Sequence, residues 1–230
     1  MEQTLSRQAA SDAVGDQGWR FLLGRLFTSV PVDSLGRAAE VAARAVAACG
    51  PDADAHLRTD LRPERAVLSL QSVAHAAVTD RDVQLAHRIS ATVAELGLRT
   101  VTEVGGAAPR SVQLLEIAID ALDIAAVRPF WKAVFGYTDE AGLDGPEDAI
   151  VDPVGQGPAI WFQQMDRPRP QRNRIHFDIC VPHDEAARRI EAALAAGGRL
   201  LSADRAPSFW VLADVEGNEV CVTTWQGRDP

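Results

Sequence analysis

Residues 115–120, Leu-Glu-Ile-Ala-Ile-Asp, begin a pattern that the chain repeats. A helix candidate that ends at Gly136 follows them, and residues 175–181, Ile-His-Phe-Asp-Ile-Cys-Val, begin the same succession again. Each copy continues into short strands that end in a similar phrase, Ile-Val-Asp-Pro-Val-Gly-Gln-Gly at 150–157 and Leu-Ala-Asp-Val-Glu-Gly-Asn at 212–218. A period of about 60 residues is too long for a solenoid. The repeat therefore predicts two β-α-β-β-β units that together form one curved sheet.

The residues before this repeat predict a different order of elements. Ser34 and Thr79 are of the types that cap helix N-termini, and Gly50-Pro51 is a helix stop. Apolar runs on both sides of Gly24 indicate a hairpin. The predicted elements are a helix at 5–14, strands at 19–23 and 25–30, a helix at 35–49, a polar strand beginning near 56, an alternating strand at 66–74 and a helix opened by Thr79. We therefore expect an α+β domain in this half.

A stretch without a periodic pattern joins the two halves. Residues 97–111 contain Gly-Gly-Ala-Ala-Pro, across which neither a helical nor a strand period continues. We predict a first domain at residues 1–104, a linker at 105–111 and a second domain at 112–230.

The composition excludes several classes of protein. The net charge is −9, with 23 basic and 32 acidic residues, which argues against a nucleic-acid binder that needs a basic face. Three scattered cysteines are too few for a disulfide framework. No apolar run approaches the roughly 20 residues of a membrane helix, and no signal peptide is visible. We expect a cytoplasmic protein without a nucleic-acid or membrane partner.

Three phrases of the first half carry a family resemblance: Gly-Trp-Arg at 18–20, the alanine-rich helix that ends at Cys49, and Val-Thr-Asp-Arg-Asp-Val-Gln-Leu-Ala at 78–86. This half resembles the pterin-4a-carbinolamine dehydratase family, which implies an antiparallel sheet with helices on one face. The resemblance also implies a lyase reaction without a metal, the removal of water from 4a-hydroxytetrahydrobiopterin. That reaction needs a general acid and a base, and histidine suits both roles.

The histidines are where the sequence departs from that family. Its His-His-Pro motif falls on residues 55–57, Ala-His-Leu, so His56 alone remains, and another family histidine falls on Val73. Positions 73 and 75 share a face of the predicted strand about 7 Å apart, so His75 can reach the pocket from its rim. The candidate catalytic residues are His56, His75 and Asp82.

Two of these candidates also have structural explanations. His56 alternates with Arg58 and Asp60, a pattern typical of a solvated polar face. Asp82 lies three residues after Thr79, a spacing that fits a helix-capping box without any catalysis.

The second half resembles the vicinal oxygen chelate superfamily, and within it the glyoxalase-like or bleomycin-resistance-like proteins. The phrases that carry this resemblance are residues 116–120, Phe130-Trp131, Phe135-Gly136, residues 176–181 and residues 214–222. Because the superfamily is built on a duplicated β-α-β-β-β unit, the resemblance agrees with the internal repeat. It implies a small-molecule pocket and, in many members, a homodimer.

In metal-using members four inward side chains converge, and the resemblance places them at Glu116, near Trp161, at His176 and at Cys221. Glutamate, histidine and cysteine can bind a divalent ion, whereas tryptophan cannot. Glu219 lies on the strand face of Cys221 and is a reserve ligand. The sequence therefore favours a metal-free pocket in which His176 and Glu116 pair with each other, with a divalent metal as the alternative.

The same positions form the predicted ligand pocket of the second domain, with Trp161, Gln163 and Cys221 as candidate lining residues. Trp161 is suited to an aromatic wall that stacks on a flat ligand.

Three hypotheses follow for the whole chain. The first is an enzyme that acts on a pterin or a related small heterocycle by acid–base dehydration. The second is a non-catalytic protein that binds or sequesters a small molecule, because both halves have lost site residues of the families they resemble. The third is a dimerisation module. None of the three requires a cofactor.

Overall fold

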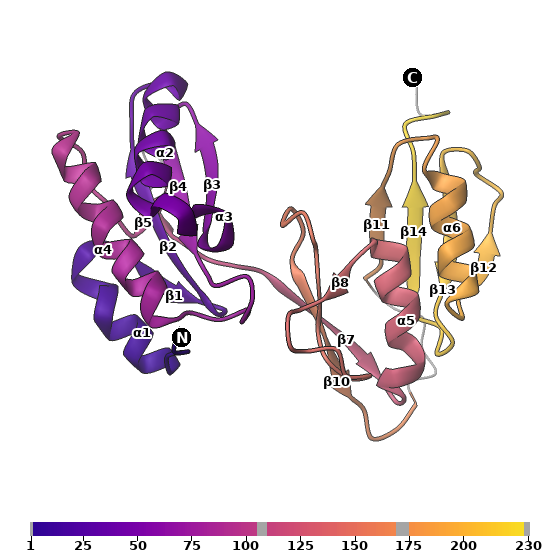
Figure 1. The fold of residues 1–230 in the computed structure, drawn as a ribbon. Helices are drawn as coiled ribbons and strands as arrows, with labels where there is room; N and C mark the ends of the chain where they lie inside the picture. Colours follow the sequence, from indigo (N-terminus) through magenta and orange to yellow (C-terminus); the bar gives the residue numbers. More distant parts are fainter. Residues whose placement is uncertain (1, 105–109, 169–174, 228–230) are drawn as a thin grey trace. The chain divides into compact units, whose positions relative to one another are not determined.

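The computed structural model describes residues 2–104, 110–168 and 175–227, and it divides the chain into two compact units, Met1–Leu114 and Leu115–Pro230 (Figure 1). Residues 105–109 of the predicted linker lie outside the described residues. The remaining two linker residues, Arg110–Ser111, form β6, which pairs with β5 (Glu103–Val104). No helix in the described ranges is long and apolar enough to cross a bilayer.

The first unit is a four-stranded antiparallel sheet with the strand order β1-β2-β4-β3. Its helices contribute to one apolar core together with the buried residues of β2 and β4, so they cover one face of the sheet. The elements are α1 (Arg7–Val14), β1 (Arg20–Leu22), β2 (Arg25–Pro31), α2 (Leu35–Cys49), α3 (Ala53–His56), β3 (Leu57–Arg62), β4 (Arg65–Leu70) and α4 (Asp80–Glu95).

The helix starts confirm the capping predictions. The Ser34 hydroxyl accepts a hydrogen bond from the backbone N–H of Arg37 at 3.2 Å, and α2 begins directly after Ser34. Thr79 and Asp82 form a complete capping box at the start of α4. The predicted stripe of that helix is also buried, since Leu85 and its neighbours on the same face lie in the core.

The strand predicted at 66–74 is shorter than its alternation indicates. β4 ends at Leu70, and the backbone N–H of Ser72 donates to the carbonyl of Ala77 at 3.1 Å, which closes a turn. Ala76 adopts a positive φ of 48° within this turn. The prediction that positions 73 and 75 lie on one strand face is therefore wrong, because the chain turns back to reach the helix that begins after Thr79.

Residues 97–101, where no period was visible, belong to the first unit. Val101 exchanges two backbone hydrogen bonds with Ser29, of 2.8 and 2.9 Å, and the Thr100 hydroxyl donates to the carbonyl of Gln17 at 2.7 Å. Gly18 permits this approach, because a Cβ atom there would lie 2.3 Å from the Thr100 carbonyl oxygen. The segment is held by backbone pairing, which leaves no signature in side-chain periodicity.

The second unit confirms the β-α-β-β-β repeat. The first module contains β7 (Glu116–Ala121), α5 (Ile124–Phe135), β8 (Thr138–Asp139), β9 (Ile150–Val151) and β10 (Ala159–Gln164). The second contains β11 (Phe177–Cys180), α6 (Ala186–Ala195), β12 (Arg199–Ser202), β13 (Phe209–Ala213) and β14 (Glu219–Thr223). In each module the first strand pairs in parallel with the last. That pairing makes two four-stranded sheets in the described residues, so the expectation of one continuous sheet is wrong.

The repeated phrase has a structural role in both modules. The Asp152 carboxylate accepts backbone hydrogen bonds from residues two, four and five positions later, at 2.7 to 2.9 Å. The Asp214 carboxylate accepts them from residues two and four positions later, at 3.0 and 2.9 Å. Burial alone would raise the pKa of Asp152, but these backbone N–H groups lower it. Each aspartate therefore shapes the turn that leads into the last strand of its module.

Candidate functional site

The first unit contains a buried histidine–carboxylate pair. His56 is the last residue of α3 and is 4% exposed, and its Nδ1 lies 2.9 Å from Oδ1 of Asp82, which is fully buried. The other carboxylate oxygen of Asp82 accepts hydrogen bonds from the backbone N–H and the hydroxyl of Thr79, at 2.7 and 2.8 Å. Asp82 therefore caps α4 and orients His56 at the same time. The interpretation of His56 as part of a solvated face is wrong, because α3 turns its ring inward before β3 begins.

Three further side chains lie on the outer side of His56. Oε1 of Glu2 is 3.2 Å from His56 Nε2, and the hydroxyl of Ser72 donates to Oε2 of Glu2 at 3.1 Å. The Nδ1 atom of His75 is 2.9 Å from the Ser72 hydroxyl and 3.7 Å from Glu2 Oε2. His75 therefore reaches the surroundings of His56, although through a turn and not through a strand. We name these residues, Glu2, His56, Ser72, His75 and Asp82, the His56 cluster.

The hydrogen bonds of the His56 cluster determine where protons can reside. A carboxylate only accepts, so both ring contacts of His56 are hydrogen bonds when each ring nitrogen carries a proton. The Ser72 hydroxyl has one proton, and when it is donated to Glu2 the hydroxyl oxygen accepts from Nδ1–H of His75. The cluster is thus a chain of donors that ends on the two oxygens of Glu2.

Two positions at which the dehydratase resemblance would imply histidine, Ala55 and Val73, lie next to the cluster. The backbone N–H of Val73 donates to the carbonyl of Ala55 at 2.9 Å, so the two positions that lack histidine lie side by side. The Val73 side chain is 52% exposed, and Ala55 is exposed as well. The histidines of the cluster are therefore His56, which is buried, and His75, which is exposed.

Arg81 fixes the start of α3 relative to α4. Its Nε atom donates to Oδ2 of Asp52 at 2.8 Å, and this hydrogen bond lowers the pKa of the Asp52 carboxyl. Because Asp52 directly precedes α3, the ion pair holds His56 in register with Asp82.

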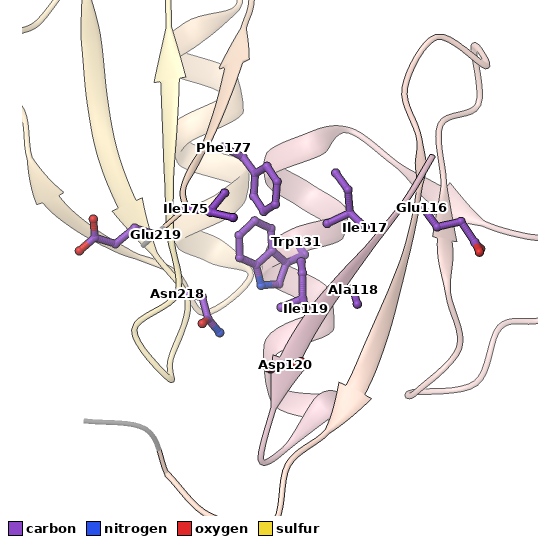
Figure 2. A pocket seen from close by; sticks show the side chains of 10 residues that line it. All are labelled: Glu116, Ile117, Ala118, Ile119, Asp120, Trp131, Ile175, Phe177, Asn218 and Glu219. Atoms are coloured by element: carbon purple, nitrogen blue, oxygen red, sulfur yellow. The ribbon is translucent and has the colours of Figure 1, made fainter. Parts of the chain in front are cut away.

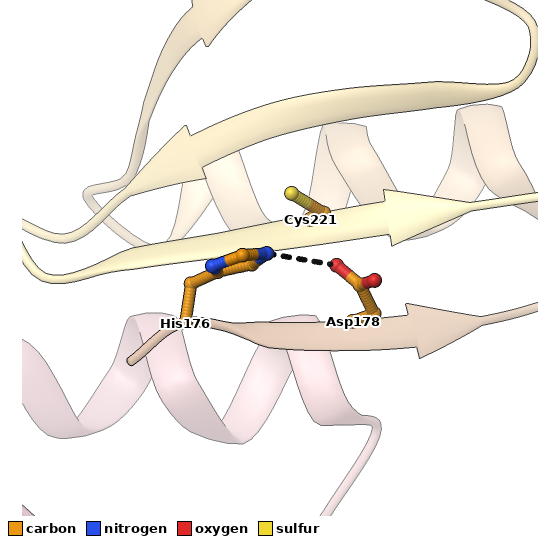
Figure 3. Close-up of side chains that lie close together, drawn as sticks. All are labelled: His176, Asp178 and Cys221. Atoms are coloured by element: carbon orange, nitrogen blue, oxygen red, sulfur yellow. Dashed lines mark ion pairs between the residues drawn. The ribbon is translucent and has the colours of Figure 1, made fainter. Parts of the chain in front are cut away.

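The second unit brings a different group of side chains together. The ligand atoms of His176, Asp178 and Cys221 all lie within 4.8 Å of one another, and His176 Nε2 is 3.6 Å from Asp178 Oδ1 (Figure 3). Asp178 and Cys221 are paired residues of the parallel strands β11 and β14, and their side chains lie on one face of that sheet. His176 and Asp178 are exposed, and Cys221 is buried. Asp178, which was not foreseen, thus takes the place that the sequence assigned to Glu116 as the partner of His176.

Glu116 lies elsewhere. A pocket of about 390 Å³ is lined by residues of both modules, with Trp131 between β7 and β11. Glu116 and Glu219 both line it, but their carboxylates point away from each other on opposite sides (Figure 2). The predicted pairing of Glu116 with His176 is therefore wrong for the described residues. The separation of the two sheets explains why, since β7 and β11 are edge strands of different sheets.

The other predicted pocket residues are placed on strand faces. Trp161 is 39% exposed and Gln163 is exposed, on the face of β10 opposite to the buried Ile160 and Phe162. Cys221 lies on β14 of the second module. None of the three predicted residues lines the pocket of Figure 2.

The donor set of His176, Asp178 and Cys221 fits a divalent transition metal in type, because imidazole, carboxylate and thiolate are all ligands of zinc. Three protein ligands are also the number found in catalytic zinc sites, which keep a position for water or substrate. Glu116 and Trp161 are not among these ligands.

The C-terminal half of the chain matches a known protein family. Residues 116–223 match the family model of the glyoxalase-like domain. The C-terminal half is a glyoxalase-like domain. Its matched region begins at the first residue of β7 and ends at the last residue of β14, so it covers both modules of the repeat.

Solved structures similar to the chain include examples for each half. A glyoxalase/bleomycin resistance protein/dioxygenase family enzyme from Burkholderia phytofirmans is 18% identical, over 49% of this chain and 98% of its own, with a TM-score of 0.37. The fosfomycin resistance protein FosX from Mesorhizobium loti is 12% identical, over 48% and 90%, with a TM-score of 0.39. A transcriptional coactivator/pterin dehydratase from Brucella melitensis is 18% identical, over 39% and 98%, with a TM-score of 0.35. A search of curated proteins gave no match.

Proposed function

We propose that the first unit catalyses the acid–base dehydration of a pterin or a related small heterocycle, with His56 as the proton donor. The observation that carries this proposal is the buried contact of 2.9 Å between His56 Nδ1 and Asp82 Oδ1. A buried carboxylate that contacts one ring nitrogen holds the imidazole in a fixed orientation. The second ring nitrogen, Nε2, faces the Glu2 carboxylate at 3.2 Å, so a substrate must displace that carboxylate to receive a proton from it.

In the proposed reaction His56 Nε2–H protonates the departing hydroxyl, the C–O bond breaks, and water leaves. The proton on the ring nitrogen of the heterocycle passes to a base as the C=N bond forms. His75 is the proposed base, because its side chain is 43% exposed and its Nδ1 atom lies 2.9 Å from the hydroxyl of Ser72. Overall, the substrate loses one water and the enzyme returns to its starting protonation state after proton exchange with solvent.

The test is the rate of 4a-hydroxytetrahydropterin dehydration by the full chain, followed by absorbance. His56→Ala should reduce the rate by about 10²- to 10⁴-fold, the usual loss for a positioned acid–base group. His87→Ala is the matched control, because His87 is exposed on α4 and contacts only the carbonyl of Ala13 among the described residues. A wild-type rate equal to the uncatalysed rate, or a His56→Ala rate equal to wild type, would refute the proposal. A binding or dimerisation role would then be the better account.

For the glyoxalase-like domain we propose a small-molecule binding function at a divalent metal held by His176, Asp178 and Cys221. The close approach of their ligand atoms, all within 4.8 Å, supports this second candidate. When bound, the metal would supply Lewis acidity to a ligand oxygen. His176 and Asp178, whose Nε2 and Oδ1 atoms lie 3.6 Å apart, would each supply one ligand atom to it.

Calorimetric titration of the metal-stripped full chain with Zn²⁺ tests this second candidate. One ion should bind per chain in the wild type, and His176→Ala should weaken binding by about 10-fold or more. His183→Ala is the control, because His183 is exposed and packs on Trp225. Equal binding by both variants would exclude this site. We also propose a homodimer, as both family resemblances imply, and light scattering of the wild-type chain measures it directly.

A further inference from the structure

The Glu2 carboxylate occupies the open side of the His56 cluster as a ligand would. One oxygen faces His56 Nε2 at 3.2 Å, and the other accepts from the Ser72 hydroxyl at 3.1 Å. The side chain of His56 is 3% exposed, whereas that of Glu2 is 33% exposed. Glu2 is thus the outermost group of the cluster, and it engages the polar atoms that point outward.

The segment that carries Glu2 is held independently of this carboxylate. The backbone N–H of Gln3 donates to Asp80 Oδ1 at 2.9 Å, and the backbone N–H of Asp80 donates to the Gln3 carbonyl at 3.0 Å. The backbone N–H of Leu5 donates to the Val78 carbonyl at 3.0 Å, and its side chain packs on the core. The segment therefore stays in place when the Glu2 side chain is removed.

We infer that the His56 cluster binds ligands that present a carboxylate, and that Glu2 is an internal competitor for the same position. Two separate donors meet the two Glu2 oxygens, an arrangement that matches a planar carboxylate and that a single neutral acceptor cannot satisfy. A ligand must displace Glu2 to reach His56 Nε2. This inference goes beyond the proposed function: a carboxylate at His56 Nε2 takes the position of the departing hydroxyl, so such a ligand competes with the substrate of the proposed reaction.

The effective concentration of the Glu2 carboxylate determines how strongly it competes with a free carboxylate. A tethered group acts at an effective concentration in about the millimolar range or above, so a free carboxylate must exceed that concentration to bind the wild type. The probe is sodium acetate at constant ionic strength, with acetamide as the uncharged ligand of similar shape. The readout is the imidazole nitrogen and proton shifts of His56 and His75 in the isotope-labelled full chain.

The apparent Kd of acetate should be at least about 10-fold lower in Glu2→Ala than in the wild type. Acetamide should not bind, and Glu2→Ala combined with Ser72→Ala should lose acetate binding. Glu95→Ala is the matched control, since Glu95 pairs with Arg44 on the exposed end of α4. Glu2→Gln, which keeps the chain length, should shift the Kd in the same direction as Glu2→Ala if the alanine variant folds poorly.

Two results would overturn the inference. One is a folded Glu2→Ala protein whose His56 and His75 imidazole shifts do not change when acetate is added. The other is equal acetate affinity in the wild type and in Glu2→Ala. The result of the dehydration assay does not depend on the result of the acetate titration. Acetate binding without dehydration would refute the proposed reaction and leave the inference intact. Dehydration by a Glu2→Ala protein that does not bind acetate would support the proposed reaction and refute the inference.

Discussion

Replacing Asp82 with alanine removes one carboxylate from two structures at once. It deletes the acceptor for the Thr79 backbone N–H and hydroxyl in the capping box of α4. It also deletes the acceptor for His56 Nδ1–H. The carboxylate is fully buried, so water cannot replace it without opening the site.

The size of the effect follows from these contacts. Loss of a helix cap costs about 1 kcal/mol. A buried donor left without a partner costs about 1–3 kcal/mol more, and His56 Nδ1–H becomes such a donor. We therefore expect Asp82→Ala to lower the free energy of unfolding of the first unit by about 2–4 kcal/mol. With a urea dependence of about 2 kcal/mol per molar, the midpoint falls by about 1–2 M.

Trp19 gives a measurement confined to the first unit. It is the one tryptophan among residues 1–114, it is fully buried, and its indole N–H donates to the Ser90 hydroxyl of α4 at 2.9 Å. The fluorine resonance of 5-fluorotryptophan at this position, followed in a urea titration of the full chain, reports unfolding of that unit alone. Trp19→Phe assigns the resonance.

Two variants separate the contributions. Thr79→Ala removes the cap but leaves His56 with its acceptor, so it should cost about 1 kcal/mol. Asp54→Ala removes an exposed aspartate of α3 and should change stability by no more than about 0.5 kcal/mol. If Asp82→Ala cost no more than Thr79→Ala, the reasoning would be refuted, because the contact with His56 would then contribute nothing to folding.

Three further predictions concern the rest of the chain. Cys180 is exposed and the other two cysteines are buried, so a thiol reagent should modify one cysteine rapidly in the native protein and all three in urea, as counted by mass spectrometry. Hydrogen bonds from Lys132 and Arg128 lower the pKa of Asp139 in the folded protein. The stability that these bonds contribute is therefore complete above about pH 4, the usual pKa of an aspartate, and is lost as the pH falls through the lowered pKa of the folded state. Urea unfolding midpoints measured at a series of acid pH values test this. A fragment of residues 111–230 should melt cooperatively in calorimetry, and a molten fragment would contradict the predicted domain boundary.

Local sequence was sufficient for the elements whose signals lie within a few residues. The helix capped by Ser34 and the helix capped by Thr79 begin as predicted, because a cap acts on the next three residues only. The repeated strand–helix–strand pattern also predicted the two β-α-β-β-β modules of the second half, since the phrases that contain Asp152 and Asp214 recur in both copies.

Contacts between distant residues were decided by the tertiary structure alone. Glu2 carries no motif, and its carboxylate meets His56 and Ser72 because the segment around Gln3 pairs with the start of α4, 77 residues away in sequence. Asp178 replaces Glu116 beside His176 because the two modules form separate sheets. Residue types and spacing predicted which side chains could do chemistry, whereas the pairing of strands and turns determined which of them lie within hydrogen-bonding distance.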